Sequence, residues 1–116
     1  MRNYPSEREE QGAVVEYLRY RGFLFSHAPN EGKRSPATAG ILKSMGMSAG
    51  FPDLFIYEPR GKFHGLAIEM KSKKGRPTKE QIDWLSDLKK RGYAAYIAYG
   101  ADEAIRIIEL YDKEGT

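Results

Sequence analysis

Residues 53–71 read DLFIYEPRGKFHGLAIEMK, and this stretch decides the fold. The apolar run at 53–57 predicts a strand, residues 59–62 predict a turn, and residues 63–71 predict a second, longer strand. Together the three segments predict a β-hairpin, in which two antiparallel strands lie side by side.

Helices are predicted on both sides of this hairpin. Upstream, Ser6 with Glu9 has the pattern of a capping box, and Gly22 follows the last helical turn. Downstream, Thr78 with Gln81 repeats the capping-box pattern. The expected elements are a helix from Ser6 to Gly22, a strand at 23–27, a short helix at 37–45, the hairpin, a helix from Thr78 to near Gly92, a strand at 94–99 and a helix at 101–111.

The order of these elements, αβ(α)ββαβα, favours an α/β or α+β fold with helices covering both faces of the sheet. The segments 54–57 and 94–99 are nearly continuous in apolar residues, which predicts strands buried on both sides. In the downstream helix, Ile82, Leu85 and Leu88 share one apolar face. Four aromatic side chains are interpreted as core residues: Tyr93, Tyr96, Tyr99 and Trp84.

Composition narrows the class of protein. The 116 residues fit one compact domain over 1–116, and the absence of cysteine excludes disulfides, thiolate metal sites and cysteine nucleophiles. No apolar run approaches the roughly 20 residues of a membrane span, and the N-terminus has no secretory signal, so we expect no membrane partner and a cytoplasmic location. The net charge is +3, with basic residues concentrated just after the hairpin, which favours nucleic acid as a partner.

The triplet Glu69-Met70-Lys71 ends the second predicted strand. Two other acid-x-lysine triplets occur, but one lies in a predicted loop and the other in a predicted helix. Because side chains alternate along a strand, Glu69 and Lys71 should point to one face of the sheet and Met70 to the other.

The hairpin register brings Asp53 into the same place. With the turn centred near Arg60 and Gly61, paired residues should have numbers that sum to about 120–122, so Asp53 lies opposite a residue in the range 67–69. If the sum is even, Asp53 and Glu69 are neighbours on one face, roughly 5–8 Å apart at the backbone.

Two converging carboxylates with an ammonium suit a hard divalent cation and a phosphodiester. Mg²⁺ prefers oxygen ligands, takes one or two carboxylates and keeps several waters. Carboxylates this close repel each other unless a cation lies between them. Lys71 is expected to hold the attacking water or to stabilise the charge that develops on phosphorus oxygens.

At these residues the sequence resembles the PD-(D/E)XK nuclease superfamily, and within it a stand-alone VRR-NUC (virus-type replication–repair nuclease) domain. Pro52-Asp53 and Glu69-Met70-Lys71 supply the two halves of the superfamily motif. The other segments that carry the resemblance are Ser6-Glu7 through Gln11, residues 27–31 (HAPNE), residues 46–53 (GMSAGFPD), residues 68–71 (IEMK) and residues 78–81 (TKEQ).

The resemblance implies an α/β fold with a restriction-endonuclease-like αβββαβ core and a mixed central sheet flanked by helices. It implies Mg²⁺ or Mn²⁺ bound by Asp53, Glu69 and the backbone carbonyl of Met70, with Lys71 as the catalytic lysine. It also implies a homodimeric endonuclease that cleaves DNA at branched structures such as junctions or flaps.

The superfamily often has an acid on the first helix, and here two glutamates compete for that role. Glu7, Gln11, Val14 and Leu18 follow steps of four, three and four residues, so they share one helical stripe. Glu7 therefore matches best, and Glu10 is the rival, one turn further on. The alternative for Glu7 is a helix-terminal acid favoured by the macrodipole.

Gln81 matches a family position near the active site, although its capping role with Thr78 competes for the same side chain. His27 and His64 are interpreted as structural or exposed residues. The residues expected to contact nucleic acid are Asn30, Lys33, Arg34, Lys73, Lys74, Arg76 and Lys79.

Two other functions are compatible with parts of this pattern. One is a non-catalytic nucleic-acid-binding domain on a nuclease-like fold, which would not require Asp53, Glu69 and Lys71 together. The other is a restriction-type enzyme that reads a base sequence, which normally requires further elements for contacts in a groove.

Overall fold

The computed structural model of the chain describes residues 5–28 and 35–114, and the predicted nucleic-acid contacts Asn30, Lys33 and Arg34 lie outside these ranges. The order of elements is the predicted one. They are α1 (Glu7–Arg21), β1 (Phe25–His27), α2 (Pro36–Ser44), β2 (Leu54–Ile56), β3 (Leu66–Lys71), α3 (Lys79–Lys90), β4 (Ala94–Tyr99) and α4 (Ala101–Lys113).

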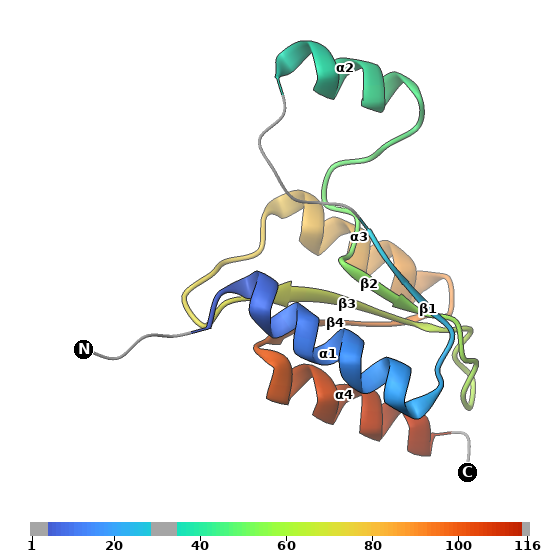
Figure 1. The fold of residues 1–116 in the computed structure, drawn as a ribbon. Coiled ribbons are helices and arrows are strands. Elements are labelled where there is room, and N and C mark those ends of the chain that lie inside the picture. Colours follow the sequence, from blue (N-terminus) through green and yellow to red (C-terminus); the bar gives the residue numbers. More distant parts are fainter. Residues whose placement is uncertain (1–4, 29–34, 115–116) are drawn as a thin grey trace.

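The four strands form one mixed sheet in the order β1-β2-β3-β4. The pairs β1–β2 and β2–β3 are antiparallel, whereas β3 and β4 are parallel and are joined through α3. Helices α1 and α4 pack together on one face, and α3 covers the other (Figure 1). The predicted mixed sheet with flanking helices is therefore confirmed.

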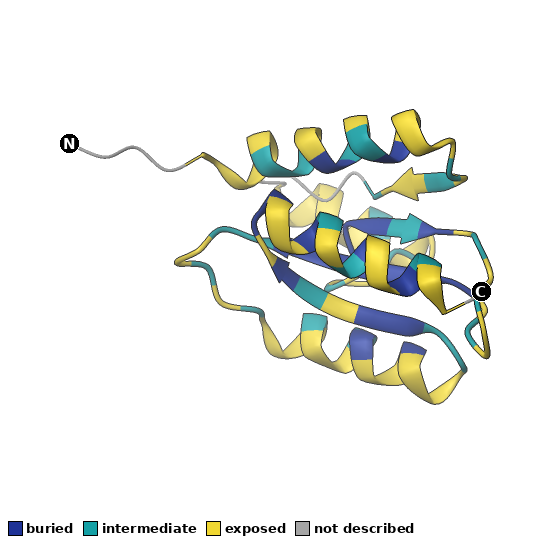
Figure 2. Ribbon diagram, turned by 90° about the horizontal axis from the view of Figure 1, so that it is seen from below, coloured by how far each residue is buried: buried dark blue, intermediate teal, exposed yellow. Residues whose placement is uncertain are grey.

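Alternation along the strands divides the core into two layers. The even-numbered residues Leu54, Ile56 and Ile68 are buried against Val14 and Leu18 of α1 and against residues of α4. The odd-numbered residues face α3, where a smaller cluster forms. That cluster consists of Ala67, Leu85, Leu88 and Ala95, with Phe55, Trp84, Tyr93 and Ile97 partly buried against it. Figure 2 shows buried residues along the strands and on the sides of the helices that face them.

Both predicted capping boxes are formed. Glu9 donates its backbone N–H to the Ser6 hydroxyl and accepts the Ser6 N–H on its carboxylate, each at 3.1 Å. Gly22 ends α1 in the left-handed conformation, with φ +73°. These contacts fix where α1 begins and therefore which turn of the helix carries its acidic residues.

The hairpin register is also the predicted one. Leu54 pairs with Ile68 and Ile56 pairs with Leu66, so paired numbers sum to an even value within the expected range. The predicted start of the second strand at residue 63 is wrong, because β3 begins at Leu66. Here the chain turns away from β2, since the His64 N–H donates to the Gly92 carbonyl (2.9 Å).

Four side chains predicted to be buried are exposed: Tyr57, Ile82, Tyr96 and Tyr99. Strand β4 is an edge strand, with β3 on one side only, and its Tyr96 and Tyr99 are exposed. The prediction that 94–99 is buried on both sides is therefore wrong at these two residues, and Tyr57 lies beyond the end of β2. On α3, Leu85 and Leu88 are buried, but Ile82 is not.

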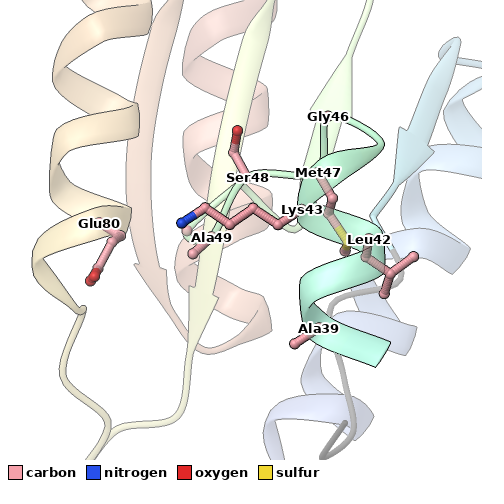
Figure 3. A pocket seen from close by; sticks show the side chains of 9 residues that line it. Ala39, Leu42, Lys43, Gly46, Met47, Ser48, Ala49 and Glu80 are labelled. Carbon is pink, nitrogen blue, oxygen red and sulfur yellow. The ribbon is translucent and has the colours of Figure 1, made fainter. Parts of the chain in front are cut away.

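Helix α2 stands away from the rest of the fold (Figure 1) and contains no buried residue. Ser35 caps it by accepting the Thr38 N–H at 3.1 Å. A cavity of about 740 Å³ lies between α2 and the first turn of α3. Lys43 extends into it from α2, and Glu80 lies on its far side (Figure 3). No helix in the described ranges is both long and apolar enough to cross a membrane.

Gly50 fixes the position of the chain just before β2. It has φ +84°, and a Cβ atom at this residue would lie 2.5 Å from the backbone carbon of Glu80 and 2.7 Å from the Gln81 nitrogen. Only glycine permits both this conformation and this approach. The segment that leads to Asp53 therefore packs directly on the first turn of α3.

We predict that Gly50→Ala destabilises the protein by about 2–4 kcal/mol, because it adds both left-handed strain and a backbone clash. Urea unfolding followed by circular dichroism measures this loss. Gly40→Ala is the matched control, since no atom lies within 4 Å of a Cβ atom there and the residue is helical. Equal stability of the Gly50→Ala and Gly40→Ala proteins would refute the role assigned to Gly50.

Candidate active site

Asp53 and Glu69 lie side by side on the α3 face of the sheet. Asp53 immediately precedes β2, and extension of the hairpin register by one residue puts it opposite Glu69. An Asp53 carboxylate oxygen (Oδ2) accepts the Met70 N–H at 2.8 Å. Both acids are nearly inaccessible to solvent, with exposures of 5% and 1%. The local cause is the even register, which turns both side chains to one face.

Lys71 completes the predicted trio. Its ammonium nitrogen (Nζ) lies 3.7 Å from Oε2 of Glu69. Met70 points to the opposite face, where it is fully buried between the sheet and helices α1 and α4. The predicted division of the Glu69-Met70-Lys71 triplet between the two faces is confirmed.

Gln81 reaches Glu69 from the first turn of α3. Its side-chain oxygen accepts the Thr78 N–H at 2.9 Å, which fixes the amide orientation, and its amide nitrogen donates to Glu69 Oε2 at 3.0 Å. The expected competition between capping and the site is therefore wrong. An amide has both an acceptor and a donor, and Gln81 uses one for each partner.

The geometry separates the two acids of α1. Glu10 is directed to α4, where its carboxylate accepts the Ala101 N–H and caps a helix whose N-cap residue is glycine. Glu7 instead lines a cavity of about 700 Å³ together with Asp53, Glu69 and Lys71. Of the two, Glu7 is thus the acid beside the buried carboxylates. Its chemical role stays a prediction.

Four residues of α1 that were not predicted to belong to the site also line this cavity: Arg8, Gln11, Gly12 and Val15. The Gln11 amide nitrogen lies 3.1 Å from Nδ1 of His27, which therefore stands at the rim of the cavity. The available signal was the helical stripe of Glu7 and Gln11, since a residue adjacent to that stripe faces the same edge of the sheet.

Residues 5–102 match the sequence model of the VRR-NUC domain. The chain belongs to the VRR-NUC domain family. A solved structure described as a VRR_NUC domain protein is 33% identical, with a TM-score of 0.86 over 98% of this chain and 93% of that one. A second, described as a VRR_NUC domain, is 21% identical, with a TM-score of 0.62 over 92% of this chain and 99% of that one. No curated protein matches the sequence.

In this VRR-NUC domain the ionised form of the Glu69 carboxyl is disfavoured. Burial raises the pKa of the Glu69 carboxyl from 4.5 to about 9, and the neighbouring Asp53 carboxyl adds to the rise. Glu7 acts in the same direction, whereas Lys71 opposes it. Within the described residues, Oε1 of Glu69 is buried without a hydrogen-bond partner. A buried carboxylate in this state is relieved either by a proton or by a cation.

The donor set fits a cation that takes few protein ligands. No group of three or more His, Cys, Asp or Glu side chains suited to a metal occurs in residues 5–28 and 35–114. Asp53 and Glu69 supply two carboxylates, and the register puts Pro52 opposite Met70. The Met70 N–H points towards β2, and in an antiparallel pair the carbonyl of the same residue points the same way. The Met70 carbonyl therefore faces Pro52, which has no N–H to donate to it.

Basic residues follow β3 directly. Lys73, Lys74 and Arg76 line a cavity of about 700 Å³ together with Tyr99. Lys79, at the start of α3, is largely exposed and pairs with Asp83 at 2.8 Å. The structure thus gathers three of the predicted nucleic-acid contacts into one loop, whereas Lys79 makes an ion pair on the helix surface.

We predict that Glu69→Gln stabilises the metal-free protein at pH 8 by about 1–3 kcal/mol. Folded Glu69 keeps its proton to about pH 9, whereas unfolded Glu69 loses it near pH 4.5, so the folded state binds more protons between these values. The stability of the wild type therefore falls as pH rises through this window, and the advantage of the variant disappears below pH 4.5.

Urea unfolding with a chelator at pH 4.5 and pH 8 measures this difference. Glu109→Gln, on the exposed side of α4, removes the same kind of charge at the surface and serves as control. A wild type that equals or exceeds the Glu69→Gln protein in stability at pH 8 would contradict the prediction.

Proposed function

We propose that this VRR-NUC domain is a metal-dependent DNA endonuclease that hydrolyses phosphodiester bonds in branched DNA, such as junctions or flaps. One observation carries the proposal. Oε1 of Glu69 is buried without a hydrogen-bond partner in the described residues, and the Asp53 carboxyl lies beside the Glu69 carboxyl. The other oxygen of Glu69, Oε2, lies 3.7 Å from the Lys71 ammonium. A purely structural role for Glu69 gives no reason to keep such an arrangement in the core.

Asp53, Glu69 and the Met70 carbonyl would hold Mg²⁺ or Mn²⁺. Gln81 donates to Oε2 of Glu69, and Lys71 pairs with the same oxygen. That arrangement leaves Oε1 for the cation. When bound, such an ion polarises a phosphodiester and lowers the pKa of water.

The other side chains act on the substrate or on the carboxylates. Lys71 contributes the positive charge that stabilises the negative charge developing on the phosphate oxygens or orients the attacking water. Gln81 is a positioning residue, because its amide holds the Glu69 carboxylate in place. Glu7 brings a third acid to the cavity and increases its attraction for cations.

DNA would approach over the loop that follows β3. Lys73, Lys74 and Arg76 provide charge complementary to the phosphate backbone, next to the proposed site. Lys79 and the residues Asn30, Lys33 and Arg34 are proposed as further contacts. The domain is proposed to span residues 1–116.

The proposal predicts cleavage that requires Mg²⁺ or Mn²⁺ and stops on addition of a chelator. Labelled duplex, single strand, flap and four-way junction form the substrate panel, and we expect the branched substrates to be cut fastest. Lys71→Ala and Glu69→Ala should each lower the cleavage rate by at least about 100-fold, because each removes a group that acts on the reacting phosphate or its cation.

Lys90→Ala is the control for lost positive charge, since Lys90 is exposed at the opposite end of α3 from Gln81. Circular dichroism and melting temperature verify that each variant is folded. A Lys71→Ala protein that cuts at the wild-type rate would disprove the lysine role. Binding of DNA without cleavage in either metal would favour the non-catalytic domain.

We further propose that the domain acts as a homodimer. The candidate site is a single small cavity, so one copy is suited to cutting one strand, and both strands of a junction need two copies. Sedimentation velocity should give the mass of two chains in the presence of junction DNA. A single-chain mass both with and without DNA would rule the dimer out.

A further inference from the structure

A further cavity, of about 360 Å³, lies beside the candidate active site on the α3 face of the sheet. Its lining is apolar and aromatic, with a few hydroxyl and imidazole groups, and none of its described lining residues carries a carboxylate, ammonium or guanidinium group. We name it the aromatic pocket. The residues that define it are Phe51, Phe55, Trp84, Ser26, His27 and Ser48.

Two aromatic side chains of the pocket, Phe51 and Trp84, pack against each other. The rings of Phe51 and Trp84 meet edge to face, with centroids 5.2 Å apart and planes at 77°. Phe55 and Trp84 pack on the smaller core cluster, so the pocket is an extension of that cluster that opens to solvent. Phe51 is 37% exposed, so one of the aromatic walls is accessible from solvent.

The pocket is continuous with the candidate active site. His27 and Ala28 line both cavities. Phe51 precedes Asp53 by two residues, a span of at most about 7 Å. In a nucleotide, a single sugar ring separates the phosphate from the base. If the phosphate lies at Asp53, the distance from phosphate to base is comparable with the span from Asp53 to Phe51. The base of such a nucleotide therefore comes within reach of Phe51.

We propose that the aromatic pocket binds one unpaired base of the DNA substrate, adjacent to the phosphate that is cut. This inference rests on the proposed nuclease function. The uncharged lining suits a base and does not suit a phosphate, whereas base–aromatic stacking accepts any base because every base has a π-face. His27 and Ser48 supply hydrogen-bonding groups for its edge.

The proposal gives a physical reason for a preference for branched DNA. A base inside a duplex must be unpaired and unstacked before it can enter a pocket, whereas a base in a single-stranded flap is already free of a partner. Gln11 contacts His27 between the two cavities, because its amide nitrogen lies 3.1 Å from Nδ1 of the ring.

Trp84 provides a direct probe, since it is the only tryptophan of the chain. Its fluorescence is followed while metal-free protein is titrated with a flap duplex, and then with the same flap carrying abasic residues at the branch. We expect quenching by the flap with bases and an affinity about ten-fold higher than for the abasic flap. Without metal, the measurement does not depend on cleavage.

Phe51→Ala should reduce the ten-fold preference to within about two-fold, because one stacking wall is lost. Tyr20→Ala is the matched control, as Tyr20 is an aromatic residue of α1 that is 88% exposed. It should keep the full preference. Melting temperatures of both variants verify that they are folded, and the comparison of the two flaps with wild-type protein stands without any variant.

Equal affinity of the wild type for the two flaps, or an absence of Trp84 quenching, would overturn the base pocket. A Phe51→Ala protein that loses its dimer would assign the pocket to a second copy and would also overturn it. If the preference for bases stands but no DNA is cut in Mn²⁺, the pocket is supported and the nuclease proposal fails. If DNA is cut but the protein shows no preference for the flap with bases, the nuclease proposal is supported and the base pocket fails.

Discussion

The rest of the structure depends on the contact between the Asp53 carboxylate and the Met70 N–H, at 2.8 Å. This hydrogen bond extends the β2–β3 ladder by one residue through a side chain, because the Asp53 carboxylate accepts the N–H that follows the last backbone pairs. It holds Asp53 opposite Glu69, so that two carboxyl groups lie side by side where solvent hardly reaches them. Because the two carboxylates repel each other when both are ionised, a cation between them is favoured.

Three elements carry the surrounding residues to this contact. Helix α3 presents Gln81 because its capping box sets where its first turn begins, and Gly50 allows that turn to pack on the segment before β2. Helix α1 is tied by Glu10 to the N-terminus of α4, which orients Glu7 towards the cavity. Each of these contacts lies near the ends of helices, so the site is assembled from helix termini around one strand end.

The sequence was sufficient where local chemistry decides the structure. Turn residues near Gly61 set the hairpin register, and alternation then placed Glu69 and Lys71 on one face. Prediction failed where distant segments decide. Residues 58–64 leave the ladder because they bind other parts of the chain: Tyr111 donates to the Glu58 carbonyl, and Arg60 pairs with Asp112. Similarly, the exposure of Tyr96 follows from the order of strands in the sheet, which no local pattern contains.

Helix α2 contributes no buried side chain to either core layer. Natural variation in chain length is therefore expected to concentrate there, since doubling the length of a flexible connection costs only about 0.6 kcal/mol. The same property makes it a convenient attachment point for a fluorophore or for a grafted recognition peptide. The domain thus combines a buried reaction centre with a neighbouring helix that engineering can exchange.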